Sequence, residues 1–105
     1  MHVVITGGLG FIGSSIAKRL CRDGHAVSII DNCTTSITKA VDGAGLVQLD
    51  LMDATATATV DLADADCLMH LAGPSSGMEA QADPVKTISE GYQITLNTLK
   101  LAKRL

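Results

Sequence analysis

A glycine pattern that directly follows a run of β-branched residues constrains this chain more than any other feature. Residues 3–6 read VVIT, which is typical of a buried strand, and residues 7–13 continue as GGLGFIG. After this segment, apolar residues recur every fourth position at Ile12, Ile16 and Leu20. The sequence therefore predicts a strand over residues 2–6, a glycine turn, and a helix over residues 11–22 that stops at Asp23-Gly24.

The glycine turn fits the spacing GxGxxG, and its position between a strand and a helix predicts a dinucleotide site. One glycine makes the tight turn, another lets the diphosphate approach the backbone, and the last lets the helix pack against the strand. Free N–H groups at the positive end of the helix dipole then face the phosphates. The alternative is a glycine-rich turn without a ligand. The predicted contact residues are Gly7, Gly10, Phe11, Ile12 and Gly13.

An acidic residue, Asp31, ends the second predicted strand over residues 26–30. A carboxylate at this place accepts hydrogen bonds from the adenosine ribose and repels a 2′-phosphate. No arginine follows nearby to receive such a phosphate, which favours NAD over NADP. The alternative for Asp31 is an ordinary turn residue, because Asp-Asn is good turn chemistry.

The remaining pattern predicts two further strands, a short helix and a long helix. The strands cover residues 46–50 and 66–72, the short helix covers residues 54–63, and residues 32–45 form a loop. The long helix covers residues 84–104, with the apolar face Ile88, Tyr92, Thr95, Leu96, Leu99 and Ala102. Lys100, Lys103 and Arg104 are expected to complement the dipole of its last turn.

This order of elements indicates an α/β fold, a Rossmann-like doubly wound parallel sheet with strand order 3-2-1-4. We expect the fold to be truncated after the fourth strand and its following helix. Residues 1–105 are then one partial NAD-binding domain without a second domain.

Composition excludes several other classes of protein. The net charge is −3 without a basic cluster, which argues against nucleic-acid binding. No apolar run reaches the roughly 18 residues of a membrane span. The 3 cysteines show no CxxC spacing, and the 3 histidines are too scattered for a metal site. A reducing cytoplasmic location is therefore expected.

Four segments resemble the extended short-chain dehydrogenase/reductase family, the NAD-dependent nucleotide-sugar epimerases and dehydratases. They are TGGLGFIGS at residues 6–14, DNCTTS at residues 31–36, Asp50-Leu51, and HLAG at residues 70–73. The resemblance implies that the second segment wraps the adenosine, that Asp50 meets the adenine amino group, and that the last passes beneath the nicotinamide ribose. The further cofactor contacts that it implies are Asp31, Asn32, Thr35, Ser36, Asp50, Leu51, Leu71, Ala72 and Gly73.

The chain departs from this family at three places. Gly91 stands where the family has a helix asparagine, and Ile94 stands where it has a small residue. The catalytic Ser or Thr and the Tyr-x-x-x-Lys pair of the family come later than residue 105, and Tyr92 is followed four residues on by Leu96 instead of a lysine. We therefore predict no catalytic residue within this chain.

Three polar residues lie within or just after the fourth predicted strand: His70, Ser75 and Ser76. His70 is interpreted as a strand residue, because no nucleophile or orienting carboxylate lies beside it in the sequence. Ser75 and Ser76 either touch the nicotinamide end of the cofactor or are ordinary loop serines.

Three functional hypotheses follow. The chain is the NAD-binding portion of an epimerase or dehydratase that takes a nucleotide sugar in its full-length relatives, or a stand-alone nucleotide-binding module or sensor, or a partial fold that only assembles with a partner. We also expect a homo-oligomer. The fourth strand would be an uncovered sheet edge, and Leu96, Leu99 and Leu101 would lack a covering element.

Overall fold

The computed structural model describes residues 1–74 and 76–105, and it contains one parallel sheet of four strands. The strands lie in the order β3-β2-β1-β4, and every neighbouring pair is parallel. This confirms the strand order predicted from the sequence. The strands are β1 (His2–Thr6), β2 (Ala26–Asp31), β3 (Ala44–Gln48) and β4 (Cys67–His70).

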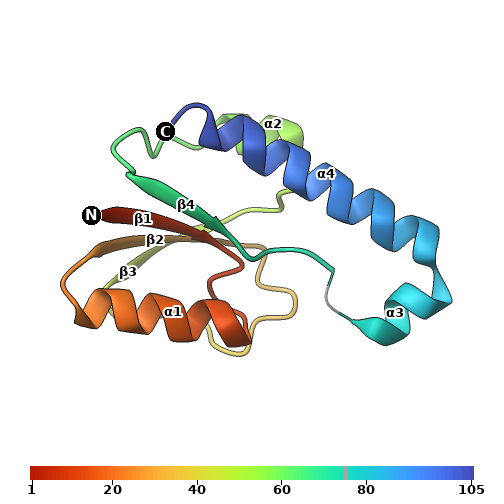
Figure 1. Ribbon diagram of the computed structural model, residues 1–105, viewed down its shortest axis with the longest axis horizontal. Helices are drawn as coiled ribbons and strands as arrows, with labels where there is room; N and C mark the ends of the chain where they lie inside the picture. Colours follow the sequence, from red (N-terminus) through yellow and green to blue (C-terminus); the bar gives the residue numbers. More distant parts are fainter. Residues whose placement is uncertain (75) are drawn as a thin grey trace.

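Helices cover both faces of the sheet, as the doubly wound fold class requires. Helix α1 (Phe11–Arg22) lies on one face, and α2 (Ala54–Ala58) and α4 (Pro84–Ala102) lie on the other (Figure 1). The short helix α3 (Gly77–Ala82) lies beyond the end of the sheet. The predicted fold class is therefore confirmed.

Alternate residues of the two central strands face two separate hydrophobic clusters. Ile5 and Ile29 pack between the sheet and α1, whereas Val4 and Ile30 pack on the side of α4. All four side chains are fully buried or nearly so. This two-sided burial explains why the central strands read as continuous aliphatic runs.

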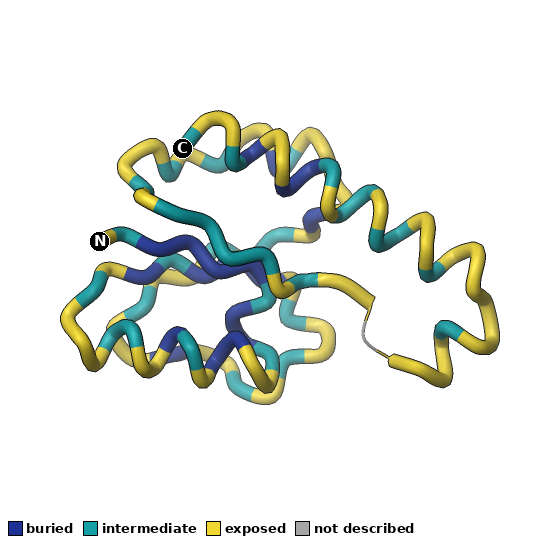
Figure 2. Tube along the Cα trace, viewed as in Figure 1, coloured by how far each residue is buried: buried dark blue, intermediate teal, exposed yellow. Residues whose placement is uncertain are grey.

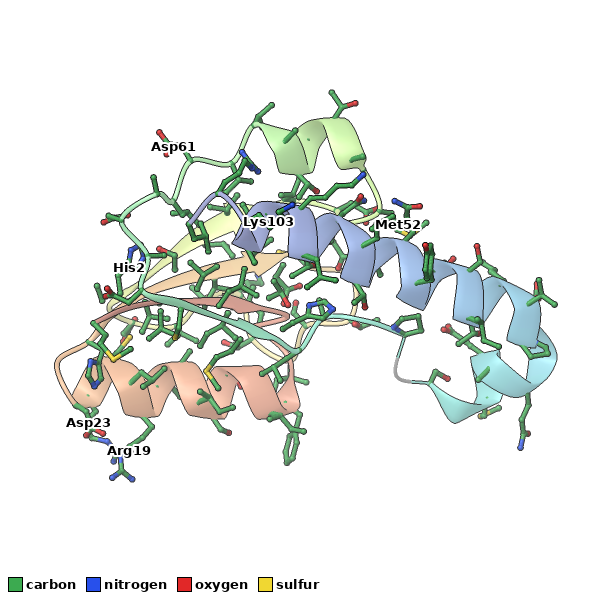
Figure 3. All side chains as sticks on the ribbon, turned by 45° about the horizontal axis from the view of Figure 1, so that its top comes forward. His2, Arg19, Asp23, Met52, Asp61 and Lys103 are labelled. Carbon is green, nitrogen blue, oxygen red and sulfur yellow. The ribbon has the colours of Figure 1, made fainter. Side chains whose placement is uncertain are left out.

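Helix α1 begins directly after the glycine turn and ends where the sequence predicted. Gly24 adopts a left-handed conformation with φ of 89° just past the helix, as a glycine stop signal requires. Arg19 and Asp23 form an exposed ion pair of 3.0 Å at the end of α1 that lies away from the glycine turn (Figure 3).

Several element boundaries in the second half differ from the prediction. Strand β3 starts two residues earlier, at Ala44, because its register pairs Ala44 with Val27 and Gln48 with Asp31. Strand β4 is shorter than predicted and ends at His70, because the next amides turn toward the Thr6 side chain. Helix α3 was not predicted; the Ser76 hydroxyl caps its start by accepting from the Glu79 N–H.

The C-terminal ends of α2 and α4 were also predicted too far along the chain. Helix α2 ends at Ala58 instead of residue 63, and α4 ends at Ala102 instead of residue 104. Past the end of α4, the Arg104 guanidinium donates to the carbonyl groups of Thr57, Ala58 and Val60. Arg104 therefore satisfies the last carbonyls of α2. It lies outside α4 and is not part of that helix's last turn, contrary to the sequence prediction.

The predicted apolar face of α4 is buried only in part, since Leu96 and Ala102 are half-buried. Ile88, Tyr92 and Leu99 are exposed, whereas Leu101, which we expected to be uncovered, is 0% exposed. The sheet covers only the C-terminal part of the helix, and the N-terminal part extends past the carboxyl ends of the strands (Figure 2). The buried face also includes Asn97 and Thr98, so an apolar pattern did not identify it.

Candidate functional site

The glycine turn lies at the carboxyl end of the central strand β1, where parallel sheets of this type bind ligands. Gly7 has φ of 71°, a conformation that favours glycine, and its N–H donates to the carbonyl of Ile30 at 2.8 Å. The Gly10 N–H closes the turn by donating to the Gly7 carbonyl at 3.1 Å. The turn is therefore attached to β2 and also leads directly into α1.

Most glycines of the turn are required by neighbouring atoms of the chain. A side chain at Gly13 would overlap the Gly7 carbonyl and would lie 2.9 Å from the Gly8 Cα atom. A side chain at Gly7 would lie 2.9 Å from the Ala72 nitrogen, and one at Gly8 would lie 2.7 Å from Ile29. Gly13 thus lets the helix pack against the turn, as predicted.

Gly10 is less crowded than these glycines. The nearest atom to an added Cβ atom is the Gly7 carbonyl oxygen at 3.3 Å, and the backbone is extended, with φ of −77° and ψ of −178°. Any residue can adopt this backbone conformation. The contact with the Gly7 carbonyl oxygen is tight, but no further atom outside the adjoining residues lies within 4 Å of the added Cβ position, so a space remains in front of Gly10.

The first turn of α1 presents free donors to that space. Among the described residues, no side chain caps the helix, and the first helical bond joins the Ser14 N–H to the Gly10 carbonyl. Phe11 and Ile12 are 79% and 63% exposed. The N–H groups of this turn and the helix dipole together form an anion-binding surface.

Asp31 lies beside the glycine turn at the end of β2. The residue is 9% exposed, and its carboxylate accepts from the Leu9 N–H at 3.0 Å and from the Cys33 N–H at 2.8 Å. The second bond closes a local turn, so Asp31 does act as a turn residue. The first bond joins the carboxylate to the glycine turn. A carboxylate has about four lone-pair positions, so two accepted bonds leave capacity for a ligand hydroxyl.

The loop after Asp31 lies against the same turn. The Ile37 N–H donates to the Leu9 carbonyl at 3.0 Å, which joins residues 32–37 to the glycine turn. Asn32 accepts from both the N–H and the hydroxyl of Thr34, at 3.1 Å and 3.0 Å. Thr35 is exposed and Ser36 is half-buried within this loop. The structure thus brings the predicted loop residues next to the predicted phosphate residues.

The pair Asp50-Leu51 divides between surface and core. Asp50 is exposed after β3 and accepts from the Met52 N–H at 2.9 Å. Leu51 is buried in the cluster beneath α4, and its carbonyl accepts from the buried Asn97 amide at 2.7 Å. Asn97 is a structural residue that the sequence did not identify.

Thr6 is the residue of the site that the sequence interpretation missed. Its hydroxyl is fully buried and accepts from the N–H groups of Leu71 at 3.0 Å and Ala72 at 3.2 Å. It therefore holds the segment after β4 against the glycine turn, where Gly7 leaves room for the Ala72 backbone. The available signal was a polar residue at the end of an otherwise aliphatic strand.

The loop between β4 and α4 completes this side of the site. Gly73 is exposed and follows Ala72 directly. Ser75 lies outside the described residues, and Ser76 caps α3, which favours its interpretation as an ordinary loop serine. Gly91 on α4 faces this loop, since an added side chain there would lie 3.9 Å from the Pro74 ring.

A groove of about 310 Å³ lies between β4 and α4, on the outer side of the sheet edge. His70, Thr95 and Leu99 contribute to its walls. Burial lowers the pKa of His70 below its usual value of 6.5. The groove is lined by different residues from those of the glycine turn.

The parallel sheet, the glycine turn at its centre and the uncapped helix define a Rossmann-type nucleotide-binding fold. Over residues 3–105, the sequence matches the NAD dependent epimerase/dehydratase family. This chain belongs to that family, which confirms the resemblance inferred from its motifs.

Curated relatives and solved structures agree with this assignment. The chain is 35% identical to UDP-glucuronic acid decarboxylase 1 of Danio rerio, and the match covers 99% of this chain and 25% of that protein. It is 37% identical to a probable UDP-arabinose 4-epimerase 3 of Arabidopsis thaliana, with 93% and 26% covered. The chain therefore spans about a quarter of the length of these relatives.

Among solved structures, a UDP-glucose 4-epimerase of Thermus thermophilus in complex with NAD superimposes with a TM-score of 0.86 at 29% identity. The match covers 96% of this chain and 33% of that one. A UDP-glucose-4-epimerase of Stenotrophomonas maltophila with bound NAD and formylated UDP-arabinopyranose gives 0.86 at 26% identity, with 99% and 34% covered. Within the described part of this chain, no helix is long and apolar enough to cross a membrane.

Proposed function

We propose that this chain is the NAD-binding portion of an NAD-dependent nucleotide-sugar epimerase or dehydratase. The observation that carries the proposal is the open space at Gly10, in front of a helix N-terminus that no described side chain caps. A diphosphate at this place would accept hydrogen bonds from the free N–H groups of Phe11 and Ile12. Family membership supports the same ligand, because the family is NAD dependent.

In this proposal Asp31 binds the adenosine ribose, and residues 32–36 and Asp50 lie around the adenosine. Residues 71–73 lie beneath the nicotinamide ribose. Asp31 supports NAD over NADP, because its buried carboxylate would repel a 2′-phosphate and already accepts from the Leu9 N–H beside the phosphates.

Calorimetric titration of the chain with NAD and NADP tests the proposal. We expect binding of NAD in preference to NADP, and Asp31→Ala should weaken NAD binding by about 1–3 kcal/mol. Asp50→Ala, which changes an exposed carboxylate farther from the turn, should have a smaller effect. Equal affinity for the two nucleotides, or no binding of either, would contradict the proposal.

The chemistry of the longer relatives is proposed to be absent from residues 1–105 themselves. The supporting observation is that no Tyr-x-x-x-Lys pair occurs in the sequence, since Leu96 stands four residues after Tyr92. The relatives carry names that refer to UDP-sugars, so we propose a nucleotide sugar as the substrate of a full-length protein of this type. Steady reduction of NAD by this chain with a nucleotide sugar would contradict the proposed absence of this chemistry from residues 1–105.

We also propose that the chain self-associates and resides in the cytoplasm. Self-association is supported by the edge position of β4 and by the exposed apolar residues Val85, Ile88 and Tyr92 on α4. The cytoplasmic location is supported by three cysteines that are free thiols. Light scattering after size exclusion tests self-association, and a single-chain mass that persists on concentration would contradict it.

A further inference from the structure

The Thr6 hydroxyl stands at the centre of a hydrogen-bond chain that links three elements. It accepts from the Leu71 and Ala72 amides, and it lies 2.7 Å from the Nδ1 atom of His70. The other ring nitrogen of His70, Nε2, lies 3.3 Å from the hydroxyl of Thr95 on α4. These hydrogen bonds thus connect the segment beside the glycine turn, through β1 and β4, to α4.

The protons available to these hydrogen bonds determine which ring nitrogen of His70 carries a proton. A hydroxyl has one proton and two lone pairs. Because two amides occupy the lone pairs of Thr6, its proton must point toward Nδ1 of His70. Nδ1 is then an unprotonated acceptor, and the proton of a neutral imidazole lies on Nε2, where it can be donated to Thr95.

The surroundings of His70 favour this neutral form. On the α4 side the groove walls are Thr95, Thr98, Leu99 and Ala102, none of which is charged, and β1 contributes the neutral Thr6. The titratable groups that β4 and its approach contribute to the groove are Asp66 and Cys67. In the described part of the chain no carboxylate forms an ion pair with His70, and burial lowers its pKa.

We propose that His70, in its neutral form, is a positioning residue for the segment 71–73. By accepting the Thr6 proton, it leaves both lone pairs of Thr6 for the amides of Leu71 and Ala72. Protonation places a hydrogen on Nδ1, so Thr6 must accept from His70, and the Leu71 and Ala72 amides then compete for its one remaining lone pair. Leu71 also donates to the backbone carbonyl of Thr6 at 3.1 Å, whereas the described residues offer Ala72 no second acceptor, so Ala72 is the amide that this competition can leave without a partner.

The Ala72 amide is also the one that packs on the glycine turn, where Gly7 approaches the Ala72 nitrogen. The consequence for ligands rests on the proposed NAD binding: protonation of His70 loosens the backbone beneath the nicotinamide half and weakens the binding of NAD. ADP, which lacks that half, should be affected little.

Two measurements on the full chain test this inference between about pH 8 and pH 5. In the first, nuclear magnetic resonance follows the ring nitrogens of His70 and the amides of Leu71 and Ala72 without nucleotide. We expect a proton on Nε2 in the neutral form, and an Ala72 amide that shifts in step with the protonation of His70. An Ala72 amide that does not follow His70, or a neutral form with its proton on Nδ1, overturns the inference.

In the second measurement, calorimetry compares NAD binding by the wild type, His70→Asn and the control His25→Asn. Asn keeps an acceptor near the place of Nδ1 and does not titrate. We expect about a tenfold loss of affinity toward pH 5 in the wild type and in His25→Asn, as for a lost hydrogen bond of a half-buried amide, and no such loss in His70→Asn. An equal loss in His70→Asn overturns the inference.

The two measurements separate this inference from the proposed function. Absence of NAD binding at every pH, together with an Ala72 amide that follows His70, would contradict the proposed function and support the positioning role. NAD binding that does not change with pH in the wild type would support the proposed function and overturn the positioning role.

Discussion

Residues 2–31 form β1, α1 and β2, and residues 67–102 form β4, α3 and α4, yet neighbouring atoms constrain the two regions differently. In the first region a glycine turn packs against α1, Ile29 and Ala72, and three of its glycines have no room for a side chain. In the second region β4 is an edge strand, and α4 contacts the sheet only with its C-terminal part (Figure 1). Close approach of backbone atoms leaves a clear signal in the sequence, whereas partial coverage of a helix does not.

The largest expected effect concerns the buried face of α4. Leu101→Ala should lower the free energy of unfolding by about 2–5 kcal/mol, because this side chain is fully buried between α4 and the sheet. The matched variant Leu99→Ala, on the same helix but 59% exposed, should change it by no more than about 0.5 kcal/mol. Urea unfolding measures both, and equal losses would contradict this packing of α4.

A smaller effect is expected for a packing glycine in the first region. Gly13→Ala should cost about 1–3 kcal/mol of unfolding free energy, because the added atom overlaps the rigid backbone of Gly7 and Gly8. Gly45→Ala on β3 is a suitable control, since its nearest neighbour would be the Ser28 hydroxyl at 4.0 Å. Equal losses of unfolding free energy in the two variants would contradict the tight contact between the turn and the helix.

The smallest effect concerns the dependence of stability on pH. Burial lowers the pKa of His70 from 6.5 in the folded chain, so the unfolded chain binds this proton at a higher pH. Stability from His70 is therefore fully present above pH 6.5 and is lost as the pH falls toward the lowered pKa. Thermal unfolding of the wild type and His70→Asn should show this extra loss in the wild type only. Parallel curves would argue against a neutral, half-buried His70.

The sequence predicted the first region almost completely. The strand, the turn, the helix and its glycine stop all lie where the pattern placed them, and Asp31 lies beside the turn. Each of these features depends on neighbours close in sequence or on a backbone conformation that few residues adopt. The strand order also followed from chain order and the handedness of crossovers.

The second region was predicted less well for physical reasons. The apolar stripe of Ile88, Tyr92 and Leu99 fits an amphipathic helix, but the sheet does not reach it, and the buried face instead uses Asn97 and Thr98. Polar residues there are satisfied by bonds to Leu51 and Ile94, which a periodicity cannot reveal. The role of Thr6 was missed for the same reason, since its partners lie 65 and 66 residues away.

The most direct test of the central claim is the binding of NAD by Gly10→Ala. An added Cβ atom at this position would make one tight contact, 3.3 Å from the Gly7 carbonyl oxygen, which a small shift can relieve, so the claim is that the missing side chain leaves room for a diphosphate. We predict an unfolding free energy within about 1 kcal/mol of the wild type. We also predict an NAD affinity at least about tenfold weaker by calorimetry, whereas Gly45→Ala should bind as the wild type does. Unchanged NAD affinity in a stable Gly10→Ala chain would contradict the account.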